Sequence, residues 1–356
     1  SVTFGANSQL TTIGEFAFYK TTSLTSIAIP DTVTSIGEGV FDSATSLNSI
    51  TFGTGSQITT IGTYAFYETA LTTIAIPDLV TTIGNEAFYG TPFLNSITFG
   101  TGSQLNSIGD YAFRYATALT SIAIPDLVTT IGTSAFYGTT VLNSVTFGAN
   151  SQLTTIGEQV FREASALTSI AIPDTVTTIG AGAFYGTTNL NSVTFGANSQ
   201  LTSIGSYAFR EASALTSIAI PDGVTGINEL TFYQTTSLTS VTFGENSQLT
   251  TISDWVFYGT TSLNSVYIPS GVTAIGPNAF LETTSLTTVY LTEDLTIDVT
   301  TYEIGTSGSF FGAVNVSFVP STIITGTGPF ELLDWTGAGS PTNFMISGFS
   351  SVAPNA

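Results

Sequence analysis

The side chains of this sequence that could do chemistry are few, and their types favour binding over catalysis. The 356 residues include no histidine and no cysteine, 24 acidic residues and only 4 basic ones. A serine nucleophile would therefore lack its usual base, and thiol, haem and zinc chemistry would lack their usual ligands. The sequence predicts a protein that is not an enzyme and that needs no cofactor.

Three of the four basic residues recur at one position of the sequence pattern. Arg114, Arg162 and Arg210 each follow a phenylalanine, and Glu163 and Glu211 come directly after two of them. Such arginines can neutralise neighbouring acids, or they can bind a carboxylate of a partner protein. Because arginine is enriched at interface hot spots, these three are candidate binding residues.

Two tyrosines are the other binding candidates. Small or hydroxyl-bearing side chains fill the outward positions of the expected main strand, until Tyr267 and Tyr290 interrupt the pattern. Columns of hydroxyls suit close stacking of β structure. Binding of a glycan or peptide is a second interpretation, and ordering of water, as in ice-binding solenoids, is a third.

Acidic residues form one regular column and one tight cluster. The column follows five Ile-Pro pairs and comprises Asp31, Asp78, Asp126, Asp174 and Asp222. Its members are expected to lie about 10 Å apart, too far to share a calcium ion, so we expect them to cap and solvate turns. The cluster of Glu293, Asp294 and Asp298 is the calcium candidate. Asn315 begins the single glycosylation sequon.

These residues are carried by a unit of about 24 residues that is repeated twelve times. Each copy contains T-x-I-G-x-x-A-F or a close variant, and a leucine-led strand follows. Successive isoleucines are separated by 22 or 23 residues and by 25 residues in alternation, so the full period is a pair of coils. The isoleucines are Ile13, Ile36, Ile61, Ile83, Ile108, Ile131, Ile156, Ile179, Ile204, Ile227, Ile252 and Ile275.

A repeat this short cannot bury its own apolar face and must stack on its neighbours. The sequence therefore predicts a β-rich solenoid of about 12 coils over residues 1–291. Each coil should contain two short strands, the first ended by Pro or Gly, and a compact turn or single helical turn around the phenylalanine. Residues 292–356 leave the pattern, and we expect a degenerate last coil with a cap or docking region there.

The repeat resembles a known family. Residues 167–184 read L-T-S-I-A-I-P-D-T-V-T-T-I-G-A-G-A-F, which is similar to the signature of BspA-like (Treponema-type) leucine-rich repeats. The resemblance covers roughly residues 2–291 and implies a curved leucine-rich solenoid outside a bacterial or protist cell. It implies adhesion and protein contact rather than catalysis. The chain departs from the family in its alternating coils, in which F-G replaces I-P-D.

Composition narrows the choice of partners. A net charge of −20 disfavours contact with nucleic acid or anionic lipid, and no apolar run is long enough to span a membrane. Ser1–Glu15 repeats Ser144–Glu158, so the chain begins within a coil. Preceding repeats, head-to-tail stacking of copies and a frayed end are the three interpretations.

We therefore expect a non-enzymatic extracellular or cell-surface protein, structural or adhesive, that contacts itself or other surface molecules. A monomeric adhesin for a host protein, matrix protein or glycan is the alternative, and an ice-binding solenoid is a minor one.

Overall fold

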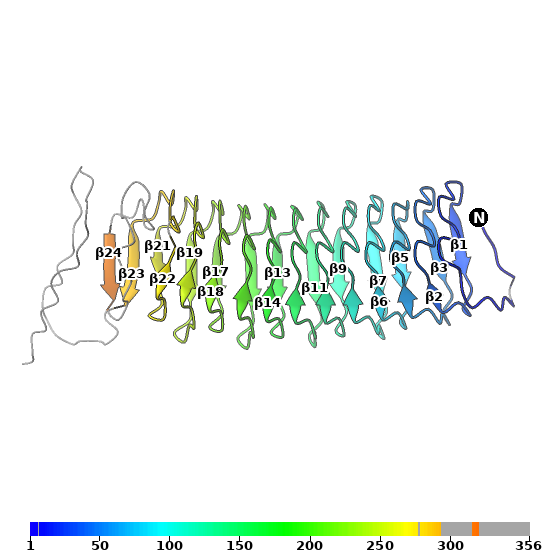
Figure 1. The fold of residues 1–356 in the computed structure, drawn as a ribbon, viewed down its shortest axis with the longest axis horizontal. Helices are drawn as coiled ribbons and strands as arrows, with labels where there is room; N and C mark the ends of the chain where they lie inside the picture. The colour runs from blue at the N-terminus through cyan, green and yellow to red at the C-terminus, as the bar shows by residue number, and fades with distance from the viewer. Residues whose placement is uncertain (6, 277, 293–314, 320–356) are drawn as a thin grey trace, which may run out of the picture.

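The computed structural model describes residues 1–5, 7–276, 278–292 and 315–319. In these residues the chain winds into a long rod of stacked coils, with the N-terminal coil at one end and β24 at the other (Figure 1). Each coil contributes one main strand and one short strand, and two turns connect them. The predicted β-solenoid is confirmed, and the described residues contain no helix.

The main strands form one face of the rod and the short strands form another. The main strands are β1 (Ser26–Ile29), β3 (Ser49–Phe52), β5 (Thr73–Ile76), β7 (Ser96–Phe99), β9 (Ser121–Ile124), β11 (Ser144–Phe147), β13 (Ser169–Ile172), β15 (Ser192–Phe195), β17 (Ser217–Ile220), β19 (Ser240–Phe243), β21 (Ser265–Tyr267), β23 (Thr288–Thr292) and β24 (Asn315–Val319). The short strands are β2 (Ser35–Ile36), β4 (Thr60–Ile61), β6 (Thr82–Ile83), β8 (Ser107–Ile108), β10 (Thr130–Ile131), β12 (Thr155–Ile156), β14 (Thr178–Ile179), β16 (Ser203–Ile204), β18 (Gly226–Ile227), β20 (Thr251–Ile252) and β22 (Ala274–Ile275).

The short strands form one continuous parallel sheet. All eleven, from β2 to β22, lie in chain order in it. An isolated bridge between Ile13 and Ile36 extends the same register to the first coil. All twelve isoleucines therefore lie in one column, as the sequence predicts.

The main strands pair unevenly, and the unevenness follows the two kinds of coil. We call coils whose main strand ends in Ile-Pro the I-P coils, and those whose main strand ends in Phe-Gly the F-G coils. An I-P strand pairs with the next F-G strand over its full length, as in Ile170↔Val193 and Ile172↔Phe195. An F-G strand pairs with the following I-P strand at one residue at most. Ser144↔Ser169 and Ser192↔Ser217 are such pairs, and the other junctions of this kind between described main strands have no ladder pair.

The main face is thus built of doublets, each an I-P strand and the F-G strand that follows it. The doublets are β1–β3, β5–β7, β9–β11, β13–β15 and β17–β19. β21 also pairs with β23 over its full length, although β23 ends in Leu-Thr instead of Phe-Gly. Asp126 fixes one doublet, because its Oδ1 atom lies so close to Gly148 of the next coil that a side chain there would overlap it. Asp174 and Gly196 have the same relation.

The core is a set of continuous side-chain columns. Eleven phenylalanines, from Phe41 to Phe280, are fully buried, and Phe18 lies half-buried on the first coil. Their rings stack at centroid distances of 5.0 Å to 5.6 Å. Such pairs add about 1 kcal/mol each to the free energy gained from burial. The predicted phenylalanine column is confirmed.

The segment around each phenylalanine is a turn whose backbone hydrogen-bonds to the next coil. Around Phe161, the residues two positions before and two after it have positive φ, at Gln159 (53°) and Glu163 (60°). The amides of these three residues donate to carbonyls of the following coil at 2.8 Å. The compact turn predicted for this position is therefore confirmed, and no helical turn forms.

Several predictions concern the chain beyond residue 292. β24 pairs in parallel with β23 and so adds one more strand to the main face. The calcium candidates Glu293, Asp294 and Asp298 lie outside the described residues. The division of the chain at residue 291 stays a prediction, because most of residues 292–356 lie outside them too. No described segment forms a helix long and apolar enough to cross a bilayer.

Candidate functional site

Tyrosines and arginines follow the buried phenylalanines and form one column along the turn side of the rod. We call it the Tyr–Arg column. The stacked phenylalanines fix the spacing of its members, because each member is the next residue in the chain. The column comprises Tyr67, Tyr89, Arg114, Tyr137, Arg162, Tyr185, Arg210, Tyr233 and Tyr258, all half-buried.

At each end of the column, tyrosines stack directly on one another. The rings of Tyr67 and Tyr89 are parallel within 5°, with centroids 4.9 Å apart. Tyr233 and Tyr258 stack at 4.8 Å with an interplanar angle of 14°. Since ring faces are covered by these neighbours, ring edges and phenol oxygens remain as the groups that the column can offer to a partner.

In the middle of the column, arginines lie between tyrosines. The Cζ atom of Arg162 is 5.3 Å from the ring centroid of Tyr137 and 4.5 Å from that of Tyr185. Arg210 lies in the same way between Tyr185 at 5.0 Å and Tyr233 at 4.6 Å. Arg162 therefore makes two cation–π contacts, and Arg210 makes a third with Tyr207 at 5.9 Å. Such contacts contribute about 0.5–1 kcal/mol apiece at partly exposed sites.

Arg114 is surrounded by tyrosine rings, and it forms no ion pair with an acidic side chain of the described residues. Its Cζ atom is 4.5 Å from the ring centroid of Tyr137 and 4.9 Å from that of Tyr115, and its Nη2 donates to the Tyr115 hydroxyl at 3.2 Å. Burial lowers the pKa of Arg114, but the hydrogen bond and the Coulombic attraction of Tyr115 leave that pKa above its ordinary value. Arg114 is thus a permanent positive charge held by phenols.

Glutamates beside the other two arginines only partly satisfy them. Arg210 Nε donates to Glu211 Oε1 at 3.1 Å, whereas the Arg162 Nε to Glu163 Oε1 distance is 3.6 Å. The Nε atoms of Arg114 and Arg162 are buried without a hydrogen-bond partner among the described residues. Exposed pairs of this kind stabilise a protein by less than about 1 kcal/mol, so the arginines keep capacity for an added carboxylate.

Phenols of the column stay protonated to high pH. Burial, followed by the charge of Glu163, raises the pKa of Tyr137, whose hydroxyl donates to Glu163 Oε1 at 3.2 Å. A hydrogen bond to Glu282, helped by burial, raises the pKa of Tyr258 to about 12. At neutral pH these hydroxyls are therefore hydrogen-bond donors on an otherwise acidic rod.

The predicted binding residues thus fall into two separate groups. The three arginines share the Tyr–Arg column, as their common sequence position indicated. Tyr267 and Tyr290 are opposite each other in β21 and β23 on the main face, with 41% and 38% of their surface exposed. Asn315 is the first residue of β24. The tyrosines of the column were not predicted, although the alternation of Phe-Tyr and Phe-Arg dipeptides was readable in the sequence.

The other candidate columns have structural contacts. Hydroxyls on the short-strand side donate to carbonyls of the preceding coil, as Thr154 does to Thr129 at 3.3 Å and Thr202 to Thr177 at 3.2 Å. The expected capping by the aspartates is wrong for Asp126 and Asp174. Their Oδ1 atoms have no donor, because they lie against a glycine of the next coil instead.

The described residues contain no group of three or more acidic side chains that could hold a metal ion. The structure instead supplies the Tyr–Arg column, in which aromatic and cationic side chains are held by a rigid β-solenoid. Tyrosine, tryptophan and arginine are the residue types that carry binding energy at protein interfaces. This arrangement is suited to binding a macromolecule along the rod.

Comparisons with solved structures agree with the repeat geometry. A leucine-rich repeat protein from Bacteroides ovatus is 27% identical, with a TM-score of 0.69 over 87% of this chain and 82% of that one. One from Eubacterium ventriosum is 26% identical, with a TM-score of 0.51 over 85% of each chain. A leucine-rich cell surface protein from Faecalibacterium prausnitzii is 26% identical, with a TM-score of 0.44 over 89% of this chain and 85% of that one.

No curated protein sequence matches the chain significantly. The family model for the BspA type leucine-rich repeat region matches residues 2–95, 81–209 and 195–303. Together these matches extend over most of the chain and contain every residue of the Tyr–Arg column. The chain therefore belongs to the BspA type leucine-rich repeat family.

Proposed function

We propose that this protein is a non-enzymatic rod at the outer surface of a cell, and that it adheres to extracellular proteins through the Tyr–Arg column. The observation that carries the proposal is the placement of three arginines between tyrosines, next to acidic neighbours. The partner that fits is a protein that presents carboxylates and apolar side chains along a line.

The rigidity of the rod supports this proposal. The buried phenylalanines and the turn hydrogen bonds join every coil to the next, so the column is held straight without a partner. A surface that is already ordered loses little conformational entropy on binding. The family membership supports an interaction scaffold rather than an enzyme.

The test is binding to a panel of purified extracellular-matrix proteins, measured by biolayer interferometry. The variant carries Arg114→Ala, Arg162→Ala and Arg210→Ala. We expect its affinity for any matrix protein that binds to fall at least tenfold, about 1.4 kcal/mol. The matched control carries Thr154→Ala, Thr202→Ala and Thr250→Ala, which have the same coil spacing on the short-strand side. Equal affinities for the two variants, or no binding to the panel, would contradict the proposal.

End-to-end association of copies is a second candidate function. Within the chain every coil stacks on the next through the same backbone hydrogen bonds and ring contacts. Coils of two copies would stack through the same kinds of contact, and such contacts can extend a filament.

Sedimentation velocity over a range of concentrations tests this second candidate. We expect assemblies that grow with concentration and that disappear in Phe16→Ser/Tyr19→Ser. Phe93→Ser is the matched control, because Phe93 is 59% exposed but lies on the side of the rod. Monomers at every concentration, or equal loss of assembly in the control, would exclude end-to-end association.

A further inference from the structure

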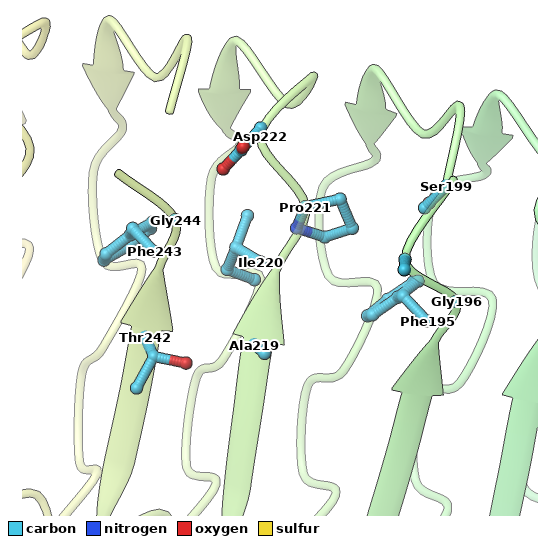
Figure 2. A pocket seen from close by; sticks show the side chains of 11 residues that line it. Phe195, Gly196, Ser199, Ala219, Ile220, Pro221, Asp222, Thr242, Phe243 and Gly244 are labelled. Atoms are coloured by element: carbon cyan, nitrogen blue, oxygen red, sulfur yellow. The ribbon is translucent and has the colours of Figure 1, made fainter. Parts of the chain in front are cut away.

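One junction between doublets leaves a groove on the main face, at the end of the main strands where the Ile-Pro and Phe-Gly residues lie. At this junction the strands β15 and β17 pair only at Ser192↔Ser217, so they are unpaired at their phenylalanine end. Figure 2 shows this end, where Phe195 and Phe243 stand on either side of Ile220 and Pro221. The hollow has a volume of about 350 Å³.

The groove combines apolar walls with a carboxylate at its rim. The half-buried rings of Phe195 and Phe243 and the ring of Pro221 supply the walls. Asp222 lies beside Pro221 and lines the same hollow (Figure 2). We call the edge of the main face that carries these residues the Phe–Asp edge.

The same residue types recur at every second coil. The half-buried phenylalanines are Phe52, Phe99, Phe147, Phe195 and Phe243, and the aspartates are Asp31, Asp78, Asp126, Asp174 and Asp222. The short strands form one continuous ladder, so two coils advance the rod by two strand spacings, about 9.6 Å. The residue types that line the groove therefore recur along the edge at this step.

The edge keeps its negative charge within the described residues. The ion pairs there join Arg162 to Glu163 and Arg210 to Glu211 on the turn side, and none reaches an aspartate of this row. A partner for this edge should therefore be positively charged at the same step.

We propose that the Phe–Asp edge binds an extended basic protein segment in the polyproline II conformation, with Lys or Arg at every third residue. Three residues of polyproline II advance about 9.3 Å, which is within about 0.3 Å of the step between sites. A β-strand returns its side chains to one face every two residues, about 6.6 Å, and does not match.

The chemistry of the edge fits this occupant in both of its parts. Proline rings pack into grooves lined by aromatic side chains, and here they would lie between successive phenylalanines. The basic side chain of each repeat would reach the aspartate at the rim. The inference rests on the proposed role of the rod in extracellular contacts, but it uses residues that the Tyr–Arg column does not share.

The test uses a fluorescent peptide of Lys-Pro-Pro repeats, one for each aspartate, and measures its binding to the whole chain by anisotropy at low and physiological salt. We expect Asp126→Asn/Asp174→Asn/Asp222→Asn to weaken binding about tenfold, since three exposed ion pairs are lost. Phe195→Leu, which keeps an apolar side chain, should weaken it severalfold. The variant with all three arginines changed to alanine is the control and should bind as the wild type does.

A second peptide and an oligosaccharide test whether the conformation of the ligand or its charge determines binding. A Lys-Gly-Gly peptide of equal charge and length should bind at least tenfold more weakly, because it must be ordered on binding. Equal binding of the two peptides, no binding of Lys-Pro-Pro, or tighter Asp-dependent binding of a soluble β-1,4-linked oligosaccharide would overturn the inference. Loss of matrix binding by the arginine variant tests the proposed function separately, since that result does not involve this edge.

Discussion

The turn side and the main face of the rod are built by the same chain, yet they repeat with different periods. On the turn side every coil is bonded to the next in the same way: Phe136 donates to Val160 at 2.9 Å and Phe161 to Ala183 at 2.8 Å. On the main face, from β1 to β19, full pairing occurs only within a doublet, and at most a single pair, such as Ser144↔Ser169, joins one doublet to the next. The comparison teaches that stability has a period of one coil, whereas surface chemistry has a period of two.

The largest predicted loss of stability comes from removing a phenylalanine ring on the turn side, and it can be compared with the loss of a ring on the main face. Phe161→Ala removes a fully buried ring from the stacked column and should lower the free energy of unfolding by about 3–5 kcal/mol. Phe195→Ala removes a half-buried ring at the end of β15 and should cost only about 1 kcal/mol. Urea denaturation followed by circular dichroism measures both, and equal losses would contradict the division of roles.

A second prediction concerns the contact that holds a doublet together. Gly148→Ala places a methyl group onto Asp126 Oδ1 and should destabilise the protein by about 1–3 kcal/mol. The same change at Gly226, where only Thr251 O lies within 4 Å at 3.9 Å, should have little effect. In the double variant Gly148→Ala/Asp126→Ala the stability should return, which a double-mutant cycle would show as coupling.

A third prediction concerns the arginines as members of the Tyr–Arg column. Arg162→Ala removes cation–π contacts to Tyr137 and Tyr185 and should lower the free energy of unfolding by about 1 kcal/mol. Arg162→Lys keeps the charge but not the planar stack, so it should recover only part of that loss. Full recovery by lysine in thermal unfolding would show that charge alone matters there.

The smallest effect should appear at high pH. The Tyr258 phenol has a pKa of about 12 in the fold, against about 10 in an unfolded chain. Its contribution to stability is therefore complete below pH 10 and is lost as the pH rises through about 12. Urea midpoints of the wild type should fall more steeply over that range than those of Tyr258→Phe. Glu282→Gln, which removes the charge that favours the neutral phenol, should lower the pKa in an absorbance titration.

Much of the fold could be predicted from the sequence because identical coils leave the chain few choices. The isoleucine at Ile156, the phenylalanine at Phe161 and the leucine at Leu167 recur in register, and register alone places them in columns. The positive φ values at Gln159 and Glu163 were indicated only by other coils, in which glycine takes the same two positions, as Gly182 and Gly186 do. They are held by hydrogen bonds to the next coil, which exist only in the stack.

The candidate site was predicted less completely. The arginines were identified by their shared position, but the role of Tyr137 or Tyr185 depends on stacking distances that a sequence does not give. The doublets could not be predicted from the sequence for a related reason. Whether β11 pairs with β13 along a whole strand or only at Ser144↔Ser169 depends on backbone distances that a sequence does not give.

The turn ladder points its hydrogen bonds in one direction, and the rest of the coil points them in the other. Around each phenylalanine the amide hydrogens point toward the C-terminal neighbour, as in the bonds from Phe16 to Glu38 and from Phe18 to Val40. On the short-strand side they point toward the N-terminal neighbour, as in the bonds from Gly180 to Ile156 and from Gly205 to Ile179. The peptide dipoles therefore largely cancel along the rod, and any preferred direction between two rods lying side by side must be encoded by side chains.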